Sequence, residues 1–363
     1  MNLFYKDKLC EVLQKNNVDA ILIAPGEELE FILGHTTHIC ERFQALFIKA
    51  SGEYFYVCNK LTEDEISMYM DGNKVYGWYD KEGFLPTVQK ALEENGLIGK
   101  TIGVNSTERA YLVLDMMQNI DVKFVNGKPL LERMRICKTQ EEIENLRIAG
   151  RITDETYYEI LKFAKPGMRE KDIVDFIKEE FAKRGADFGF AIIASGENAA
   201  LPHYNDDKRI IQEQDVLLCD FGCIYKGLCA DMTRTFFVGG ATEDQKNMYN
   251  YVLRSQCAGV EAAVNGAFIP DVDKAARDII DESGYGPTFV TRLGHGIGYS
   301  IHEAPDIKQS NPMYLEPGMT FSIEPGIYRV GEFGIRIEDI VLVTEDGNET
   351  LNNATKELLI VNN

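Results

Sequence analysis

Residues 215–238 read DVLLCDFGCIYKGLCADMTRTFFV, a pattern that predicts two apolar strands joined by a glycine-containing turn. Centred on Tyr225 and Lys226, this hairpin would place Asp220 directly opposite Asp231, with their Cβ atoms roughly 5 Å apart. Two ionised carboxylates that close together in apolar strands repel each other unless a cation lies between them. The hairpin alone leaves two interpretations open: a metal site, or two solvated aspartates at strand ends.

Charge and composition exclude several kinds of partner. The chain carries a net charge of −20 over 363 residues, without a long run of one sign. Nucleic acids and anionic membranes require clustered Lys and Arg, so neither is an expected partner. The chain starts without the apolar core of a signal peptide, has no apolar stretch long enough to span a membrane, and has eight Cys scattered singly. We therefore expect a cytoplasmic protein with reduced thiols.

Two domains are predicted. Short apolar strands alternate with helical segments through residues 1–134, as in a mixed sheet that helices cover on both faces. Thr139 and Glu142 then form a capping-box pattern, which predicts a long helix that ends near Ala164. We place a first α/β domain at residues 1–134 and a second domain at 135–363.

The second domain contains a weak internal repeat. Gly185, which closes a predicted helix, is followed by His203, and the same pair recurs ninety-nine residues later as Gly284 and His302. A turn glycine before each helix repeats at the same offset. The pattern predicts two αβ halves related by a pseudo-twofold axis, with His203 and His302 as counterparts.

Further candidate ligands lie in the second half of this domain. His295 is flanked by glycines, which let other backbone approach it closely, and Glu324 ends an apolar strand. A glycine-rich run can also bind phosphate, but no strand-to-helix context accompanies this one. Arg336 and Glu338 share one face of the strand predicted over 334–343, where charged side chains are rarely buried without partners.

The candidate ligands comprise four carboxylates and one imidazole. A single zinc site would use four ligands, usually with more His or Cys. Four carboxylates and one imidazole suit two divalent ions of the Mn²⁺ kind, about 3.5–4 Å apart, while Co²⁺ or Zn²⁺ are also compatible. The five residues are Asp220, Asp231, His295, Glu324 and Glu338.

In these five residues and their flanking sequences, the chain resembles the pita-bread metallopeptidases, in the branch of the prolidases and Xaa-Pro aminopeptidases. The resemblance is strong over about residues 140–363, and the first 130 residues more loosely resemble the creatinase-like N-terminal domain of that branch. The matching segments are SGENAALPH (195–203), DMTRT (231–235), GHGIG (294–298), HEAP (302–305), EPGIY (324–328) and RIED (336–339).

The resemblance implies an α+β fold: a pita-bread catalytic domain with a pseudo-twofold αβ repeat, preceded by a smaller α/β creatinase-like domain. It also implies the distribution of ligands. Asp231 and Glu338 would bridge two metal ions, Asp220 would bind one ion, and His295 and Glu324 would bind the other.

The implied reaction is hydrolysis of the bond between an N-terminal residue and proline, in a dipeptide or a longer peptide, by a metal-bridging hydroxide. Glu324 would also handle the proton of the attacking water. His302 would hydrogen-bond the scissile carbonyl, and His203 would lie on the leaving side. Arg336 would hold the ligand beside it on its strand, Glu338, or a substrate carboxylate. Relatives in this branch often form homodimers, so a dimer is expected.

Three alternatives remain. A methionine-type aminopeptidase would fit the catalytic half but needs no N-terminal domain. A creatinase-like amidinohydrolase shares both domains but lacks the ligand set. A non-catalytic pita-bread binding protein would have lost ligands, whereas all five are present. One departure concerns position 291, where larger relatives often carry a His and this chain has Thr291.

Overall fold

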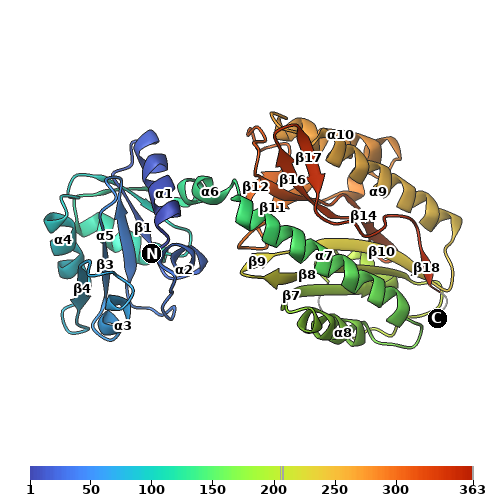
Figure 1. The fold of residues 1–363 in the computed structure, drawn as a ribbon, viewed down its shortest axis with the longest axis horizontal. Helices are drawn as coiled ribbons and strands as arrows, with labels where there is room; N and C mark the ends of the chain where they lie inside the picture. Colours follow the sequence, from blue (N-terminus) through green and yellow to red (C-terminus); the bar gives the residue numbers. More distant parts are fainter. Residues whose placement is uncertain (205, 207, 362–363) are drawn as a thin grey trace. The chain divides into compact units, whose positions relative to one another are not determined.

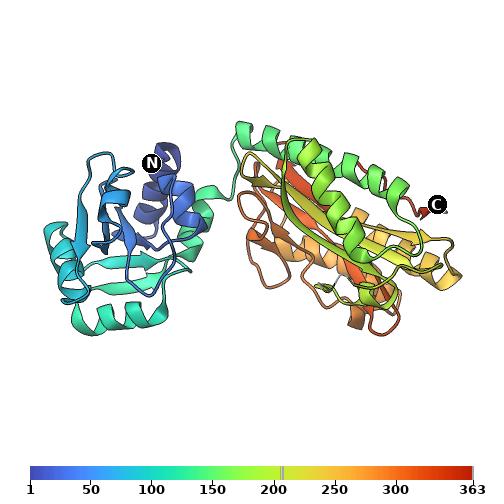
Figure 2. The same cartoon turned by 90° about the horizontal axis from the view of Figure 1, so that it is seen from below.

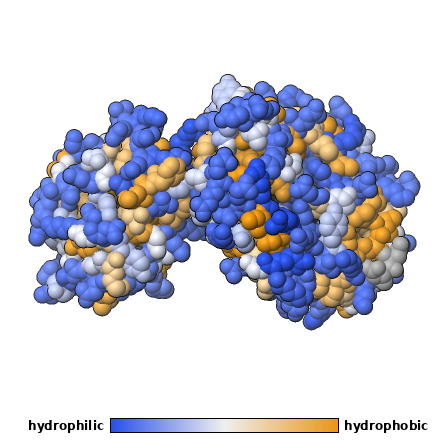
Figure 3. Space-filling model, in the orientation of Figure 1, coloured by the Kyte–Doolittle hydropathy of each residue, from blue (hydrophilic) through white to orange (hydrophobic). Residues whose placement is uncertain are grey.

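The computed structural model describes residues 1–204, 206 and 208–361 and divides into two compact units, Met1–Arg135 and Ile136–Asn363. Each unit has its own sheets (Figure 1, Figure 2). Each also has its own hydrophobic cores. Hydrophilic residues cover most of the face drawn in Figure 3, with smaller apolar patches between them. Within the described part of the chain, no helix has the length and apolarity needed to cross a membrane.

The first unit is a mixed six-stranded sheet of order β4-β3-β2-β1-β5-β6. Along β1, Ile21 and Ile23 pack into one core, while Ala20 and Leu22 pack into the core on the other face. The predicted mixed sheet with covered faces is therefore confirmed. The strands are β1 (Ala20–Ile23), β2 (Ala45–Lys49), β3 (Tyr54–Asn59), β4 (Val75–Trp78), β5 (Thr101–Val104) and β6 (Lys123–Asn126). The helices are α1 (Leu3–Lys15), α2 (Glu27–Leu33), α3 (Glu63–Ser67), α4 (Leu85–Glu94), α5 (Ala110–Asn119) and α6 (Lys128–Arg135).

The second unit has two larger sheets and a two-stranded ribbon. One sheet has the order β18-β10-β8-β7, with β9 beside β8, and the other has the order β12-β11-β13-β16-β17. The first comprises β7 (Asp187–Ser195), β8 (Val216–Tyr225), β9 (Leu228–Cys229), β10 (Met232–Val238) and β18 (Ile360–Val361). The second comprises β11 (Gly294–Gly296), β12 (Glu303–Ile307), β13 (Thr320–Ile323), β16 (Asp339–Thr344) and β17 (Gly347–Thr350). The ribbon is β14 (Gly326–Arg329) and β15 (Phe333–Arg336).

The helices of this unit repeat as the sequence predicts. Helix α7 (Gln140–Phe163) and helix α9 (Glu243–Ala262) both begin with a capping box. Each is followed by a shorter helix, α8 (Glu170–Lys183) or α10 (Ile269–Glu282), and then by an antiparallel meander, β7-β8-β10 or β11-β13-β16. Short 3₁₀ helices η1 (Gly196–Ala200) and η2 (Gly286–Thr288) complete the set. The two αβ halves are therefore present.

The two faces of β8 have different neighbours. Leu217 and Cys219 pack with residues of α7 and α8, whereas Val216 and Leu218 pack with residues of α9, α10, β13 and β16. Alternation along the strand puts Asp220 on the same side as Val216 and Leu218. Asp220 therefore lies on the side of β8 that packs against the second half of the unit.

Two details of the predicted strands were wrong. Asp220 pairs with Thr233 rather than with Asp231, because the hairpin turns at Lys226 and Gly227, one position later than predicted. Both turn residues have positive φ, of 49° and 79°, as a type I′ hairpin turn requires. Asp231 remains on the same side of the hairpin, as a diagonal neighbour of Asp220.

The predicted strand over 334–343 is interrupted. Arg336 ends β15, where it pairs with Gly326, and Asp339 begins β16, where it pairs with Ile323. The chain changes its pairing partner between them, so Glu338 lies in the gap rather than within a strand. In this segment between the strands, the backbone N–H of Glu338 donates to Thr233 O at 3.0 Å, and this bond connects the segment to β10.

Candidate metal centre

Asp220 and Asp231 come from the hairpin of the first half. Both side chains are buried, and each has an oxygen, Oδ1 in both cases, with no hydrogen-bond partner among the described residues. Burial raises the pKa of Asp231 well above its ordinary value, and the nearby carboxylates of Glu338 and Asp220 raise it further. Without a cation, this position therefore disfavours a charged carboxylate.

His295 comes from β11 of the second half. The flanking glycines are required because a Cβ at Gly294 would lie 1.8 Å from Ser322 O, and a Cβ at Gly296 would lie 2.2 Å from Ala304 backbone. His295 Nδ1 lies 3.0 Å from Gly296 O, a geometry in which Nδ1–H donates and Nε2 keeps its lone pair. Burial lowers the pKa of His295 to about 4, so the ring is neutral at physiological pH and suited to metal binding.

Glu324 directly follows β13. Its Oε1 lies 3.3 Å from His295 Nε2 and also accepts a 3.1 Å hydrogen bond from Ser322 Oγ. The same Ser322 Oγ accepts a 3.0 Å bond from the backbone N–H of His295, so one serine orients both side chains. Burial raises the pKa of Glu324, with a smaller contribution in the opposite direction from Arg336.

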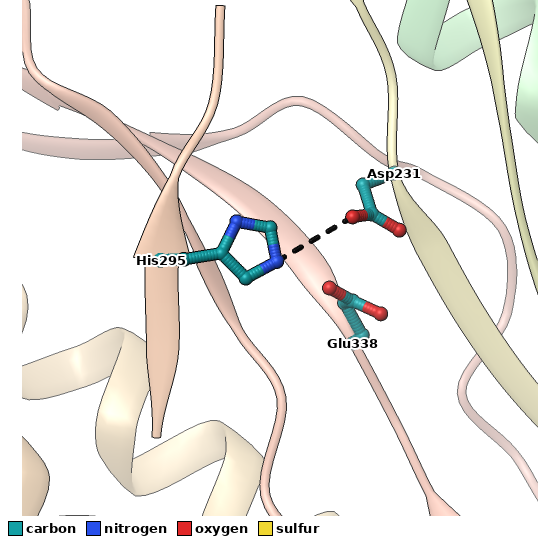
Figure 4. A group of neighbouring side chains, drawn as sticks. All are labelled: Asp231, His295 and Glu338. Atoms are coloured by element: carbon teal, nitrogen blue, oxygen red, sulfur yellow. Dashed lines mark ion pairs between the residues drawn. The ribbon is translucent and has the colours of Figure 1, made fainter. Parts of the chain in front are cut away.

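Figure 4 shows His295, Asp231 and Glu338 converging from three different segments. One potential ligand atom from each lies within 4.8 Å of the others, and His295 Nε2 is 3.6 Å from Asp231 Oδ2. Glu338 is almost completely buried, and its Oε1 has no hydrogen-bond partner within the described chain. Burial, and then the charges of Glu324 and Asp220, raise the pKa of Glu338.

These residues fit divalent cations. Three buried carboxylate oxygens lack a partner among the residues described, and the imidazole presents an unprotonated nitrogen to the same space. Buried carboxylates without partners are costly, and a cation that several of them share would remove that cost. Four carboxylates with one imidazole form an oxygen-rich donor set of the kind that Mn²⁺ prefers.

Arg336 orients one of the candidate ligands, Asp220, through a hydrogen bond. Its Nη2 contacts Asp220 Oδ2, its Nη1 donates to Tyr328 Oη at 2.8 Å, and its Nε donates to Thr233 Oγ1 at 2.9 Å. Arg336 therefore holds a predicted metal ligand, namely Asp220 rather than the nearer-in-sequence Glu338. Thr233 and Tyr328 were not predicted, although both lie within the matched segments DMTRT and EPGIY.

All predicted site residues border one cavity of about 670 Å³. His203 and His302 are exposed at this cavity, and the ring of His302 lies edge-on to that of His295, with the centroids 4.3 Å apart. Partial desolvation of the His302 ring within the cavity lowers its pKa, and the neighbouring His295 and Arg292 lower it further. The lining also includes residues that the sequence did not indicate: Phe190, Ile192, Pro202, Tyr204, Arg292 and Ile301.

Comparison with known proteins agrees with this geometry. Residues 144–345 match Metallopeptidase family M24, and residues 6–137 match the Creatinase/Prolidase N-terminal domain. The probable dipeptidase PepE of Mycobacterium tuberculosis is 35% identical over 353 residues, which cover 94% of this chain and 92% of the relative.

Two solved peptidase structures are similar to this chain over almost its whole length. Dipeptidase PepE from Mycobacterium ulcerans superimposes with a TM-score of 0.93 at 32% identity, over 99% of this chain and 97% of that one. An Xaa-Pro dipeptidase from Bacillus anthracis gives 0.85 at 31% identity, over 99% and 100% of the two chains. The chain therefore belongs to metallopeptidase family M24, with a creatinase-like N-terminal domain before its pita-bread domain. The predicted fold class is confirmed.

Proposed function

We propose that this protein hydrolyses the peptide bond between an N-terminal residue and proline, using two divalent cations held by Asp220, Asp231, His295, Glu324 and Glu338. The observation that carries the proposal is the buried cluster in which carboxylate oxygens of Asp220, Asp231 and Glu338 have no partner among the described residues. When bound, the two cations would polarise the scissile carbonyl and lower the pKa of a water molecule.

The side chains around the cluster have complementary roles. Glu324, whose pKa is raised, is suited to accept a proton from the attacking water and to pass it to the leaving nitrogen. His302 lies at the cavity beside His295, where it can donate a hydrogen bond to the oxygen that becomes negative in the transition state. His203 also borders the cavity and would contact the leaving portion of the substrate. Arg336 positions Asp220.

The proposed proline specificity is supported by the apolar part of the cavity lining. Proline forms a tertiary amide and presents an apolar ring without an N–H, so its site needs apolar walls rather than a backbone acceptor. Such walls are available in the side chains of Phe190, Ile192, Pro202, Tyr204 and Ile301. The similarity to the Xaa-Pro dipeptidase from Bacillus anthracis supports the same specificity.

Other parts of the proposal concern the metal and the assembly. We propose Mn²⁺ as the cofactor because oxygen donors predominate in the cluster. We also propose a homodimer in the cytoplasm. A non-catalytic binding role without metal is disfavoured, because the buried carboxylates would then lack the cations that offset the cost of their desolvation.

The substrate panel Ala-Pro, Ala-Pro-Ala and Ala-Ala-Ala tests the function. The protein is stripped of metal, reloaded with Mn²⁺ and assayed by release of free alanine. Cleavage of the proline substrates alone, and only after reloading, is the expected result. Equal cleavage of Ala-Ala-Ala would contradict proline specificity and favour a general aminopeptidase.

A further inference from the structure

We propose that the buried ion pair between Lys138 and Glu303 holds His302 in its catalytic position, so that both are positioning residues of the reaction. The inference rests on the proposed function, in which His302 donates a hydrogen bond to the oxygen that becomes negative. Neither Lys138 nor Glu303 had a predicted role, although Glu303 lies within the matched segment HEAP.

The ring of His302 depends on its backbone for its position. The ring lies edge-on to that of His295 and is exposed at the cavity. Among the described residues, it makes no hydrogen bond or ion pair that would fix its orientation. A group that stabilises a transition state must be held close to its working position. The support for His302 must therefore come from the residues next to it in the chain.

Glu303 directly follows His302 and begins β12. Its Oε1 accepts a 2.7 Å hydrogen bond from Lys138 Nζ, and both side chains are only 1% exposed. Its Oε2 accepts a 3.3 Å bond from the backbone N–H of Ser300. Since His302 is exposed at the cavity and Glu303 is buried, the ion pair holds this part of the backbone from the buried side.

The loop before His302 packs directly on the ion pair. A Cβ at Gly298 would lie 2.5 Å from Glu303 Oε1 and 2.5 Å from Lys138 Cε, so the backbone at this point contacts both partners. The loop is also tied to β9, because the backbone N–H of Cys229 donates to Gly298 O at 2.7 Å. The loop therefore has little freedom to move while the ion pair is intact.

Lys138 is itself anchored on other parts of the chain. Its backbone N–H donates to Gly318 O at 2.8 Å, and the preceding residue, Cys137, forms an isolated β-bridge with Met319. Its Nζ also donates to Ile136 O at 3.3 Å. The cation is therefore held independently of the loop, and it can define the position of Glu303.

The backbone of Glu303 lies beside a candidate metal ligand. Glu303 pairs with Gly296 of β11, which directly follows His295. A shift of Glu303 therefore changes the position of His302 relative to His295. Loss of either charge leaves the other buried without a partner, a state that the protein relieves by moving the loop so that water reaches the remaining charge.

Removing one charge tests the role in catalysis. Glu303→Gln keeps the size of the side chain but loses its charge. For the Mn²⁺-loaded variant we expect kcat for Ala-Pro to fall about 10- to 100-fold, as displacement of a catalytic group does, with KM and bound metal unchanged. Glu180→Gln is the matched control, because Glu180 is also buried and paired, with Lys183 and Arg184, but lies on α8 outside the cavity. This control should leave kcat unchanged.

A double variant shows whether the ion pair acts through His302. In the His302→Ala background, Glu303→Gln should lower kcat no further, because the group that it displaces is already absent. A purely structural role predicts an equal fall in the presence and absence of His302, since loss of folded protein lowers activity in either background. That result would overturn the inference.

NMR gives a readout that does not depend on turnover. The chain has five His, so the Hε1 signal of His302 can be identified by its absence from His302→Ala. The measurement uses protein loaded with Zn²⁺, which has a filled d shell and does not broaden the signals. At a fixed pH, Glu303→Gln should shift the His302 signal, whereas Glu180→Gln should not.

Lys138→Arg provides a second variant in case Glu303→Gln does not fold. It keeps the charge but replaces the compact ammonium by a larger planar group, so the loop must still move. We expect a smaller fall in kcat and the same kind of shift in the His302 signal.

The outcomes separate the inference from the proposed function. Hydrolysis of Ala-Pro with unchanged kcat and an unshifted His302 signal, in each of these variants that folds, would overturn the inference alone and leave the ion pair with a role in folding only. Hydrolysis of neither Ala-Pro nor Ala-Pro-Ala by the metal-loaded wild type would overturn the proposed function, and the inference with it.

Discussion

The Thr233 hydroxyl lies 2.6 Å from Glu338 Oε2 and, at the same time, accepts a 2.9 Å hydrogen bond from Arg336 Nε. One buried hydroxyl on β10 thus connects a candidate bridging ligand with the arginine that holds Asp220. The two halves of the catalytic unit meet at this point, since Thr233 belongs to the first half and Glu338 to the second.

Replacement of Thr233 should weaken metal binding. Thr233→Val keeps the shape of the side chain but removes the hydrogen bonds that orient Glu338 and Arg336, and such supporting contacts are worth about 10- to 100-fold in metal affinity. Titration of the metal-stripped variant with Mn²⁺ measures the loss. Thr235→Val is the matched control, because among the described residues Thr235 Oγ1 hydrogen-bonds only to the backbone of Arg336. Equal losses of affinity in both variants would contradict an orienting role for Thr233.

His302 should contribute to catalysis without holding metal. His302→Ala removes a donor for the developing negative charge, so we expect kcat for Ala-Pro to fall about 10²- to 10³-fold. Mn²⁺ content, measured by elemental analysis, should match that of the wild type. A parallel loss of metal and activity would indicate that His302 supports the cluster instead.

The metal-free protein should lose stability as the pH rises. The pKa values of Asp231 and Glu338 are raised mainly by burial, so the folded chain keeps protons that the unfolded chain releases above about pH 4. Their contribution to stability is present below that pH and is lost as the pH rises through the raised pKa values. Each excess proton corresponds to about 1.4 kcal/mol per pH unit.

Asp231→Asn tests this dependence because it removes one of the titrating groups. Urea unfolding of the metal-free proteins between pH 5 and pH 8 should show a smaller loss of stability in the variant than in the wild type. Identical pH slopes would show that the site does not control the stability of the metal-free state.

The buried ion pair between Lys138 and Glu303 should matter for folding. The Nζ–Oε1 distance is 2.7 Å, and each side chain is only 1% exposed. Lys138→Met leaves a buried carboxylate without this partner, so the free energy of unfolding should fall by about 3–5 kcal/mol. Lys274→Met breaks the exposed pair with Asp278 and should cost less than about 1 kcal/mol. Denaturant unfolding of the metal-loaded proteins distinguishes these results, and a similar small change in both would contradict the prediction.

The sequence was most informative where chemistry and local pattern coincide. The apolar strand that carries Asp220, the apolar strand that Glu324 follows, the glycines beside His295 and the capping box at Thr139 are visible in short segments, and each is present in the fold. Local pattern was less informative about register. The turn at Lys226 uses positive φ at a non-glycine residue, a conformation that its side chain does not indicate.

Tertiary contacts account for the remaining differences between the sequence-based predictions and the structure. The strand break before Glu338 arises because Arg336 pairs with β14 in the ribbon whereas Asp339 pairs with β13 in the larger sheet, which no short segment reveals. Thr233 becomes important only when Arg336 and Glu338 reach it from the other half of the unit.

We propose that hydrolysis before proline needs two metal ions, held together in the buried cluster. The most direct test titrates metal-stripped protein with Mn²⁺ and follows both bound metal and Ala-Pro hydrolysis against the molar ratio. We predict that two ions bind per chain, and that activity is absent from the stripped protein and saturates as the second site fills. Full activity without metal, or tight binding of Mn²⁺ without any hydrolysis of Ala-Pro, would contradict the account.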